Sequence, residues 1–385
     1  MKERTKPKGI VVWMVLMMLC VTVQPAMAWG GLTHYSIDRD ADKDSYEELS
    51  AANAPDAFAI REEDEDLYHF AHSEIPPLPS YILYGPLGIP LIFVADNDAQ
   101  ERWGTGWMTH ITADRSAHGH STYYPGDDCY YKAVGGNYMV SAFGGDVLSY
   151  WFHEGYCPLD VTVHQHQLGD AFENYDSTHS TNYADDYDPD QYKTDYTSLI
   201  AITVADQVAI VAGGLTLLTE TYLAYHEEYD TYYPQAVDDV EDLDSYGSSR
   251  LSLPLYGSLA SLNVSDTEEE HATMVKIRME VGKRLIDEGL LIPHKEVDAE
   301  TGDVTVSIGQ TVGNEKLVKA YKQYLGESTE RHTGEKSTIV EVLDDNMGIT
   351  IDDIKRDHPD LYQKLTENGW VNETGELVEK RPHDR

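Results

Sequence analysis

The stretch around residues 103–114 is the feature that most limits what this chain can fold into. Trp103, Trp107, His110 and Asp114 recur at the spacing that places side chains on one face of an α-helix. A histidine and a carboxylate one turn apart share that face, so one metal ion can contact both. The pattern therefore predicts a helix that carries two aromatic side chains and two potential metal ligands on the same side.

The start of the chain is typical of a secretory signal peptide. Basic residues are followed by an apolar run over residues 10–23 and by the small-residue sequence Ala26-Met27-Ala28. The apolar run is shorter than the ~20 residues that a membrane-spanning helix needs. We expect removal of residues 1–28, which predicts a secreted or extracytoplasmic protein with Trp29 as its mature amino terminus.

The charge of the chain argues against a polyanionic partner. There are 28 Lys and Arg residues against 68 Asp and Glu residues, so the formal net charge is -40. Loss of the basic leader would make the protein still more acidic. A surface of this kind repels nucleic acid phosphates, which makes nucleic acid the less favoured partner.

The cysteines predict one disulfide. Cys20 would leave with the leader, whereas Cys129 and Cys157 remain as a pair in an oxidising compartment. A thiolate metal site would need closely spaced cysteines or a nearby histidine pair, and the sequence has neither.

The second half of the chain reads as mostly helical. Residues 198–218 are apolar, but Asp206 and Gln207 interrupt the run and favour a buried core helix over a membrane span, so we expect no transmembrane span in the mature chain. The Tyr- and Asp-rich residues 174–196 lack apolar periodicity and predict a surface excursion. A helix is expected from about residue 268, and a short strand from Val304 after a turn at residues 300–303.

Further ligand candidates lie before and after the first helix. His166 and Asp170 repeat the spacing of His110 and Asp114, while Asp56 and His69 precede them. At the new terminus, the free amine of Trp29 could bind a metal together with its own carbonyl oxygen, because a metal readily deprotonates an α-amino group. His34 follows in the run Trp29-Gly30-Gly31-Leu32-Thr33-His34.

The order of these motifs resembles the zinc-dependent phospholipase C and single-strand-specific nuclease superfamily. The resemblance covers roughly residues 29–220. It implies a mainly α fold: a multi-helix phospholipase C-like domain over residues 29–260, followed by a mixed, mostly helical C-terminal extension over residues 261–385. It also implies two to three Zn²⁺ ions and hydrolysis of a phosphodiester by hydroxide formed on zinc.

The resemblance also implies how the ligands are shared. One ion would be held by Asp56, His69, His110 and Asp114, and a second by Trp29 and His34, with Asp114 bridging the two. His120, His166 and Asp170 would hold the third ion, and Asp56 would be the general base. Alternatives stay open around the third ion: His118 in place of His120, and His153, His164 or Glu173 in the later positions.

Three functions are compatible with this pattern. The acidity favours a phospholipase C-like enzyme acting on phospholipid or another phosphodiester. A single-strand-specific nuclease of the same superfamily is the alternative enzyme, since many tyrosines could stack on bases. The third possibility is a noncatalytic, metal-stabilised envelope or binding protein, because resemblance of fold does not establish activity.

Overall fold

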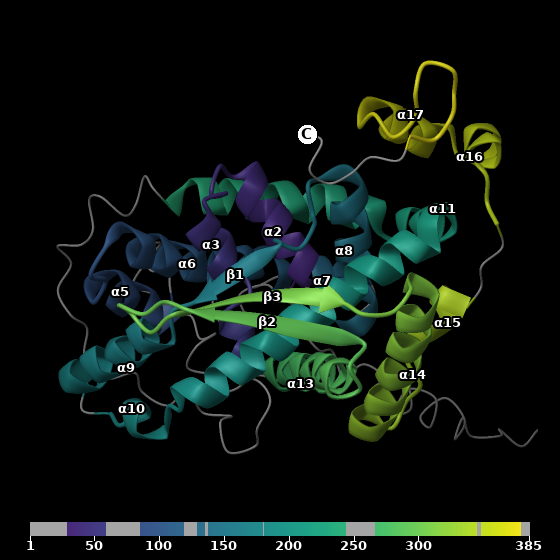
Figure 1. The fold of residues 1–385 in the computed structure, drawn as a ribbon. Coiled ribbons are helices and arrows are strands. Elements are labelled where there is room, and N and C mark those ends of the chain that lie inside the picture. The colour runs from purple at the N-terminus through teal and green to yellow at the C-terminus, as the bar shows by residue number, and fades with distance from the viewer. Residues whose placement is uncertain are drawn as a thin grey trace, which may run out of the picture.

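The structure is a computed structural model, and it describes residues 29–58, 85–118, 129–134, 138–179, 181–243, 266–344 and 348–378. The described part is mainly α, as the sequence predicts, with one small sheet lying among the helices (Figure 1). The leader, residues 1–28, lies outside the described residues, so its cleavage stays a prediction.

The first half of the chain is built from short helices that pack around two longer ones. These elements are α2 (Gly31–Asp40), α3 (Tyr46–Ala51), the 3-10 helix η1 (Pro55–Phe58), α5 (Gly85–Phe93), α6 (Asp98–His118), α7 (Tyr130–Ala133) and α8 (Tyr138–Phe152). A capping box formed by Ser45 and Glu48 starts α3. A side chain at Gly106 of α6 would place its Cβ 2.2 Å from the Glu48 carbonyl oxygen, so glycine is what lets α3 and α6 lie in contact.

The long helix α11 (Pro189–Glu241) forms the centre of the protein. Asp188 caps its first turn, and Gly214, with φ 53 and ψ -142, kinks it. It packs against α6, α8 and α13. By length and composition α11 could cross a membrane, but 56% of its most apolar window is buried inside the protein. The apolar run at residues 198–218 therefore belongs to a core helix, as expected.

The sheet joins parts of the chain that are far apart in sequence. Strand β1 (Asp160–Val163) pairs antiparallel with β3 (Val304–Gln310), which pairs antiparallel with β2 (Leu291–Val297), giving the order β1-β3-β2. Val161 and Val163 of β1 are buried, as are Val304 and Val306 of β3. The strand expected after residue 303 is present, and it binds the C-terminal part of the chain to the helical part.

The remaining elements of the described residues are helices, two before residue 260 in the sequence and five after it. They are α9 (Gln165–His179), α10 (Tyr183–Asp186), α13 (Asp266–Asp287), α14 (Asn314–Thr333), α15 (Thr338–Asp344), α16 (Ile351–Asp357) and α17 (Pro359–Glu367). The helix expected from about residue 268 is α13, and it lies along α11. Figure 1 shows α16 and α17 at one end of the molecule, where the Trp370 indole N–H donates to the Trp151 carbonyl.

The expectation of a surface excursion over residues 174–196 holds for its middle, because the described residues between 176 and 191 are half-buried or exposed, but it is wrong at both ends. This stretch forms the end of α9, α10 and the start of α11, and Tyr175, Tyr192 and Tyr196 are buried. Tyr192 donates to the Ala54 carbonyl at 3.0 Å. A tyrosine can bury its ring while its hydroxyl reaches a polar partner, so a Tyr-rich stretch without an aliphatic pattern still supplies core.

The predicted disulfide is also wrong, because the structure does not join Cys129 to Cys157. Both are buried. Cys129 precedes α7, whereas the backbone N–H of Cys157 donates to the Gln207 side chain of α11 at 2.8 Å. Burial raises the pKa of the Cys157 thiol to about 12, so this sulfur is held as an unreactive thiol in the core.

We predict that the native protein reacts with a thiol reagent at neither of these cysteines, and that both react once the protein is unfolded without reductant. A protonated, buried thiol lacks both the nucleophilic form and access to the reagent. Mass spectrometry after labelling would test this. If the unfolded, unreduced protein takes up no label at residues 129 and 157, the two cysteines form a disulfide after all.

Candidate metal centre

Three elements bring four of the sequence-predicted ligands to one buried place. His34 comes from α2, Asp56 from η1, and His110 and Asp114 from successive turns of α6. All four side chains are buried. The helix expected from the spacing of Trp103, His110 and Asp114 is therefore present, and its buried face carries these ligands.

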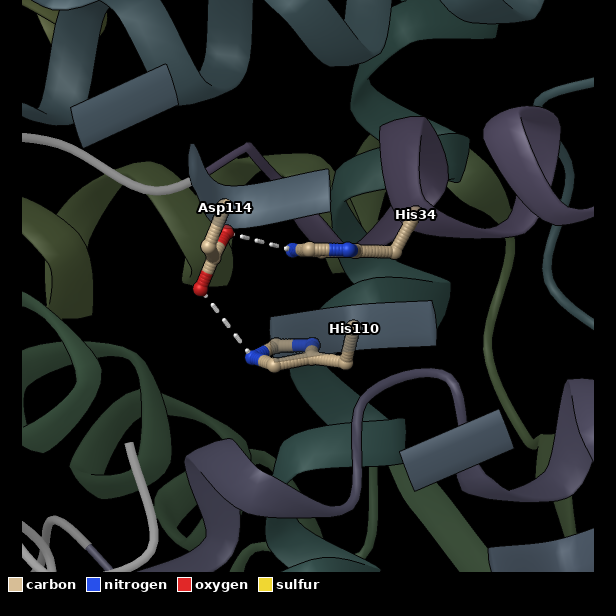
Figure 2. A group of neighbouring side chains, drawn as sticks. All are labelled: His34, His110 and Asp114. Atoms are coloured by element: carbon tan, nitrogen blue, oxygen red, sulfur yellow. Dashed lines mark ion pairs between the residues drawn. The ribbon is translucent and has the colours of Figure 1, made fainter. Parts of the chain in front are cut away.

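The carboxylate of Asp114 lies between the two imidazoles. His34 Nε2 is 3.2 Å from Asp114 Oδ1, and His110 Nε2 is 3.3 Å from Asp114 Oδ2 (Figure 2). The two rings stack with their centroids 4.1 Å apart. Asp56 Oδ1 also lies near His110 Nε2, at 3.6 Å.

The hydrogen bonds fix which nitrogen of His110 faces the carboxylates with a lone pair. His110 Nδ1 lies 2.7 Å from the Ala52 carbonyl oxygen. A carbonyl only accepts hydrogen bonds, so Nδ1 carries the hydrogen. In the neutral ring Nε2 then presents a lone pair toward two carboxylates, an arrangement that requires a proton or a metal ion. Histidines that bind a metal through one ring nitrogen usually donate a hydrogen bond to a carbonyl or carboxylate oxygen through the other.

The two histidines respond differently to their surroundings. Burial lowers the pKa of His34, and the positive charge of His110 adds to that effect. Burial also opposes the charged form of His110, but Asp114 and Asp56 outweigh it and raise its pKa to about 9. In the metal-free protein His110 is therefore the histidine of this pair that favours the protonated form at neutral pH.

The turn after α3 is held in place by three hydrogen bonds between side chains and backbone. The Ala52 carbonyl accepts from His110, as described above. Asn53 Nδ2 donates to the Gly31 carbonyl at 3.1 Å, and the Ala54 carbonyl accepts from Tyr192. This turn leads directly into η1, so these bonds fix Asp56 relative to α2 and α6.

Trp29 lies beside the centre, with its side chain fully buried. Its indole Nε1 is 3.1 Å from the carbonyl oxygen of Ala113, the residue before Asp114, and 3.2 Å from Ser116 Oγ. The ring stacks on Tyr130 with centroids 4.5 Å apart. The indole anchors the segment before α2 in the core. Coordination of a metal by the Trp29 amine and carbonyl stays a prediction.

The described residues assigned to the third ion, His166 and Asp170, are not part of this group. His166 and Asp170 lie exposed on α9. His69 and His120 lie outside the described residues. Among the described residues, the potential metal-binding group is His34, His110 and Asp114, whose ligand atoms lie within 4.8 Å of one another. The third site therefore stays a prediction.

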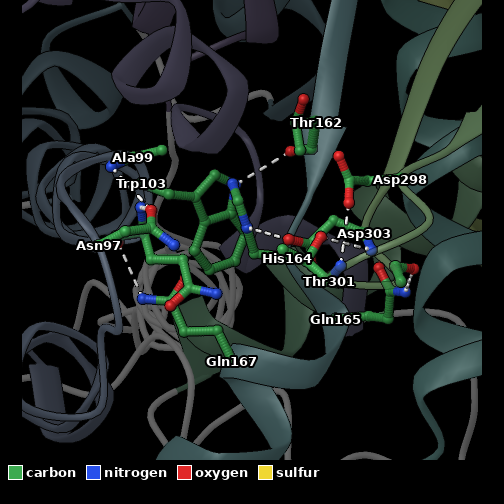
Figure 3. Close-up of polar contacts among 12 residues, drawn as sticks. Asn97, Ala99, Trp103, Thr162, His164, Gln165, Gln167, Asp298, Thr301 and Asp303 are labelled. Carbon is green, nitrogen blue, oxygen red and sulfur yellow. Dashed lines mark hydrogen bonds and ion pairs between the residues drawn. The ribbon is translucent and has the colours of Figure 1, made fainter.

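Two of the alternative histidines have other partners. His164 Nδ1 is 3.0 Å from Asp303 Oδ2, which follows the turn between β2 and β3 (Figure 3). His153 Nδ1 is 2.7 Å from Asp40 Oδ2. The third alternative, Glu173, is exposed on α9. The His164 contact, together with the bond from Gln165 Nε2 to the Gly302 carbonyl, pins the β2–β3 turn to α9.

Sequence reasoning missed one buried carboxyl group next to the centre. Asp38 Oδ2 accepts from the hydroxyl of Thr109, the residue before His110, at 3.0 Å. Burial raises the pKa of Asp38 well above its ordinary value. Asp38 stands one helical turn after His34, the spacing that had drawn attention to His110 and Asp114, and this is the signal that could have found it.

We predict that zinc affinity rises about tenfold per pH unit between pH 6.5 and pH 9, because the ion must displace the proton that His110 holds with its raised pKa. The sign for stability follows from the same shift. Because the pKa of His110 is higher in the folded than in the unfolded protein, protonation of His110 stabilises the metal-free fold below pH 6.5. This contribution is lost as the pH rises through 9. The zinc-induced rise in Tm should therefore be larger at high pH.

Thermal unfolding with zinc and with chelator, followed at several pH values, tests this. In His110→Gln the pH dependence over that window should disappear. A zinc effect on Tm that is the same at both ends of the window would contradict the assignment of the proton to His110.

Comparisons with known proteins leave the chain without an assigned family. No protein-family model matches it, and no solved structure matches it. An uncharacterized protein of Archaeoglobus fulgidus is 25% identical over 144 residues, which is 36% of this chain and 39% of that protein. The chain therefore matches well under half the length of this relative, and the likeness to the zinc-dependent superfamily rests on the order of the ligand residues.

Proposed function

We propose that the chain is a secreted zinc-dependent phosphodiester hydrolase of the phospholipase C-like type. The observation that carries this proposal is the buried group of two imidazoles facing the Asp114 carboxylate, with the Asp56 carboxylate beside it. These ligands come from separate segments of sequence, in the order that the superfamily resemblance implies.

The spacing of the donor atoms supports zinc as the ion. Imidazole nitrogen and carboxylate oxygen lie about 2.0–2.2 Å from zinc, so two donors of a tetrahedral site are ~3.3 Å apart. The distances from Asp114 to His34 and His110, 3.2 and 3.3 Å, agree with this. The donor types, two imidazoles and carboxylates, are those that zinc commonly takes in proteins.

The residues of the site have distinct proposed tasks. Asp114, whose two oxygens face different histidines, would bridge two ions. The Ala52 carbonyl would keep His110 in the tautomer that binds metal through Nε2. Asp56, 3.6 Å from His110 Nε2, would accept the proton of the attacking water as general base. When bound, zinc supplies Lewis acidity toward a phosphoryl oxygen and acidifies water at neutral pH.

The charge of the chain bears on the substrate. A formal charge of -40 disfavours a polymer that presents a phosphate at every step of its backbone. A phospholipid brings a single phosphodiester, so the same repulsion acts once. The proposed substrate is therefore a phospholipid or a similar small phosphodiester, and single-stranded nucleic acid is the outcome to test against it.

We predict that Asp114→Asn lowers hydrolysis of a chromogenic phosphodiester by at least about 100-fold and removes zinc from both His34 and His110. The amide keeps the size of the side chain but loses the negative charge that holds two dications close together. Zinc analysis and turnover would be measured on the same preparations, with phosphatidylcholine, single-stranded DNA and chelator as further arms.

Asp170→Asn is the matched control, because it is the same change at the same spacing after a histidine but on an exposed surface. It should leave the pair of ions at Asp114 in place and affect the predicted third ion alone. Equal zinc loss in the two variants, or retained turnover in Asp114→Asn, would show that Asp114 is not the bridging ligand. Zinc binding without hydrolysis of any phosphodiester would favour the noncatalytic alternative.

We predict that one alanine added before Trp29 abolishes binding of the ion assigned to Trp29 and His34, since an amide nitrogen cannot replace a free amine as a neutral donor. The buried indole should still hold the segment in place. An alanine added after Arg385 is the control and should change nothing. The same zinc content and full activity in the extended protein would refute a role for the Trp29 amine.

A further inference from the structure

Helix α2, which carries His34, begins without a capping side chain of its own. Its N-cap residue is Gly30, with φ -70 and ψ 165, and there is no side-chain cap bond from this residue. The first turn of a helix leaves backbone N–H groups that need acceptors, and Ser, Thr, Asp or Asn usually supply one from the N-cap position. The Thr33 N–H reaches the Gly30 carbonyl at 3.0 Å, and the side-chain acceptor for this first turn comes from elsewhere in the fold.

Asp146 of α8 supplies it. The backbone N–H of Thr33 donates to Asp146 Oδ1 at 2.9 Å, and the Thr33 hydroxyl donates to the same oxygen at 3.0 Å. This is the bond that an N-cap carboxylate makes, formed by a residue more than one hundred positions away. A negative charge at this end of a helix is also favoured by the helix dipole.

Gly30 is the residue that makes room for this arrangement. A Cβ at Gly30 would lie 2.3 Å from Asp146 Oδ1 and 2.4 Å from its Cγ, so the Asp146 carboxyl group would have to move away. The glycine between Trp29 and the helix therefore lets a distant carboxylate sit where a local cap would otherwise be. Ser149, one turn along α8, reinforces the contact by donating to Thr33 Oγ1 at 3.1 Å.

Burial raises the pKa of the Asp146 carboxyl to about 7, and an arginine from the C-terminal part of the chain opposes this shift. Arg278 of α13 interacts electrostatically with Asp146 and donates to Asp206 of α11 at 3.0 Å. These three side chains and Tyr321 of α14 line one small cavity. A carboxylate buried without a cation would be expensive, so Arg278 is part of what keeps Asp146 in place.

We propose that Asp146 is a positioning residue for the metal centre: it caps α2 from α8, and so sets the depth and orientation at which Trp29 and His34 meet Asp114. The inference rests on the proposed function for its metal, but the cap itself is independent of it. It also gives the extension after residue 260 a role, because α13 contributes the arginine that pairs with the capping carboxylate. In the sequence, Asp146 is recognisable as the one charged residue of the otherwise uncharged and mostly apolar helix α8.

The test compares Asp146→Ala, Asp146→Asn and Thr350→Ala in the purified protein. Thr350 caps α16 far from the centre with the same kind of bond, to the N–H of Asp353, so it controls for the general cost of losing a helix cap. The readouts are the affinity for Co²⁺, the visible spectrum of the bound Co²⁺, and amide hydrogen exchange at Thr33 and His34 in the absence of metal.

Asp146→Ala should bind Co²⁺ about 10–100-fold more weakly, as expected for loss of a residue that orients a ligand, and exchange at residues 33 and 34 should be faster. Asp146→Asn keeps an oxygen acceptor for the Thr33 N–H and should recover most of both effects. Thr350→Ala should leave the affinity and the spectrum unchanged even if its Tm falls.

The outcomes separate the two proposals. Unchanged exchange and unchanged Co²⁺ affinity in Asp146→Ala would overturn the positioning role while leaving the metal centre intact. A parent protein that binds no metal would overturn the proposed function, and faster exchange in Asp146→Ala would then still identify the cap, without a metal for it to serve. Equal loss of affinity in Asp146→Ala and Thr350→Ala would show a general effect of stability and overturn the positioning role.

Discussion

The structure depends on one electrostatic arrangement: two imidazoles that turn their Nε2 atoms toward a single carboxylate inside the protein. Burying Asp114 and Asp56 together is costly unless positive charge lies close to them. In the metal-free protein the proton on His110 supplies part of that charge, which is why its pKa is raised to about 9. A divalent cation carries the charge that matches two carboxylates, and the donor spacing fits one.

The surrounding helices hold the two imidazoles and the two carboxylates together, although the like charges of the carboxylates repel each other. The buried tryptophans of α6 fix the face that carries His110 and Asp114. The turn before η1 is tied to α2 by Asn53 and to α11 by Tyr192. At the other end of the centre, α2 is capped by Asp146, whose charge is compensated by Arg278 from α13. The centre is therefore supported by helices drawn from almost the whole described length of the chain.

The local part of this structure could be read from the sequence, because helical spacing is a short-range property. It predicted α6 with its buried face, the core helix at residues 198–218, and the strand at Val304. The order of the motifs predicted that His34, Asp56, His110 and Asp114 lie together. Helical spacing alone would not have shown this.

What the sequence did not show depends on contacts between distant residues. The lone carboxylate of α8 marks Asp146 in the sequence but does not show that it caps α2, and the pairing of β1 with β3 leaves no local pattern. Tyr175, Tyr192 and Tyr196 are core residues. The sequence did not show this, because the partners of the Tyr192 and Tyr196 hydroxyls come from distant parts of the chain. The even number of mature cysteines suggested a bond, whereas the fold uses Cys157 as a buried, apolar-like side chain with a protonated thiol.

The central claim is that His34, His110 and Asp114 are metal ligands, with Asp114 shared between the ions bound at the two histidines. Crystals of the protein grown with zinc, with diffraction recorded on both sides of the zinc absorption edge, test it most directly. The account predicts an anomalous peak within about 2.0–2.2 Å of His34 Nε2 or His110 Nε2 and of an Asp114 oxygen. Well-ordered density for these side chains with no anomalous peak among them, in crystals saturated with zinc, would contradict it.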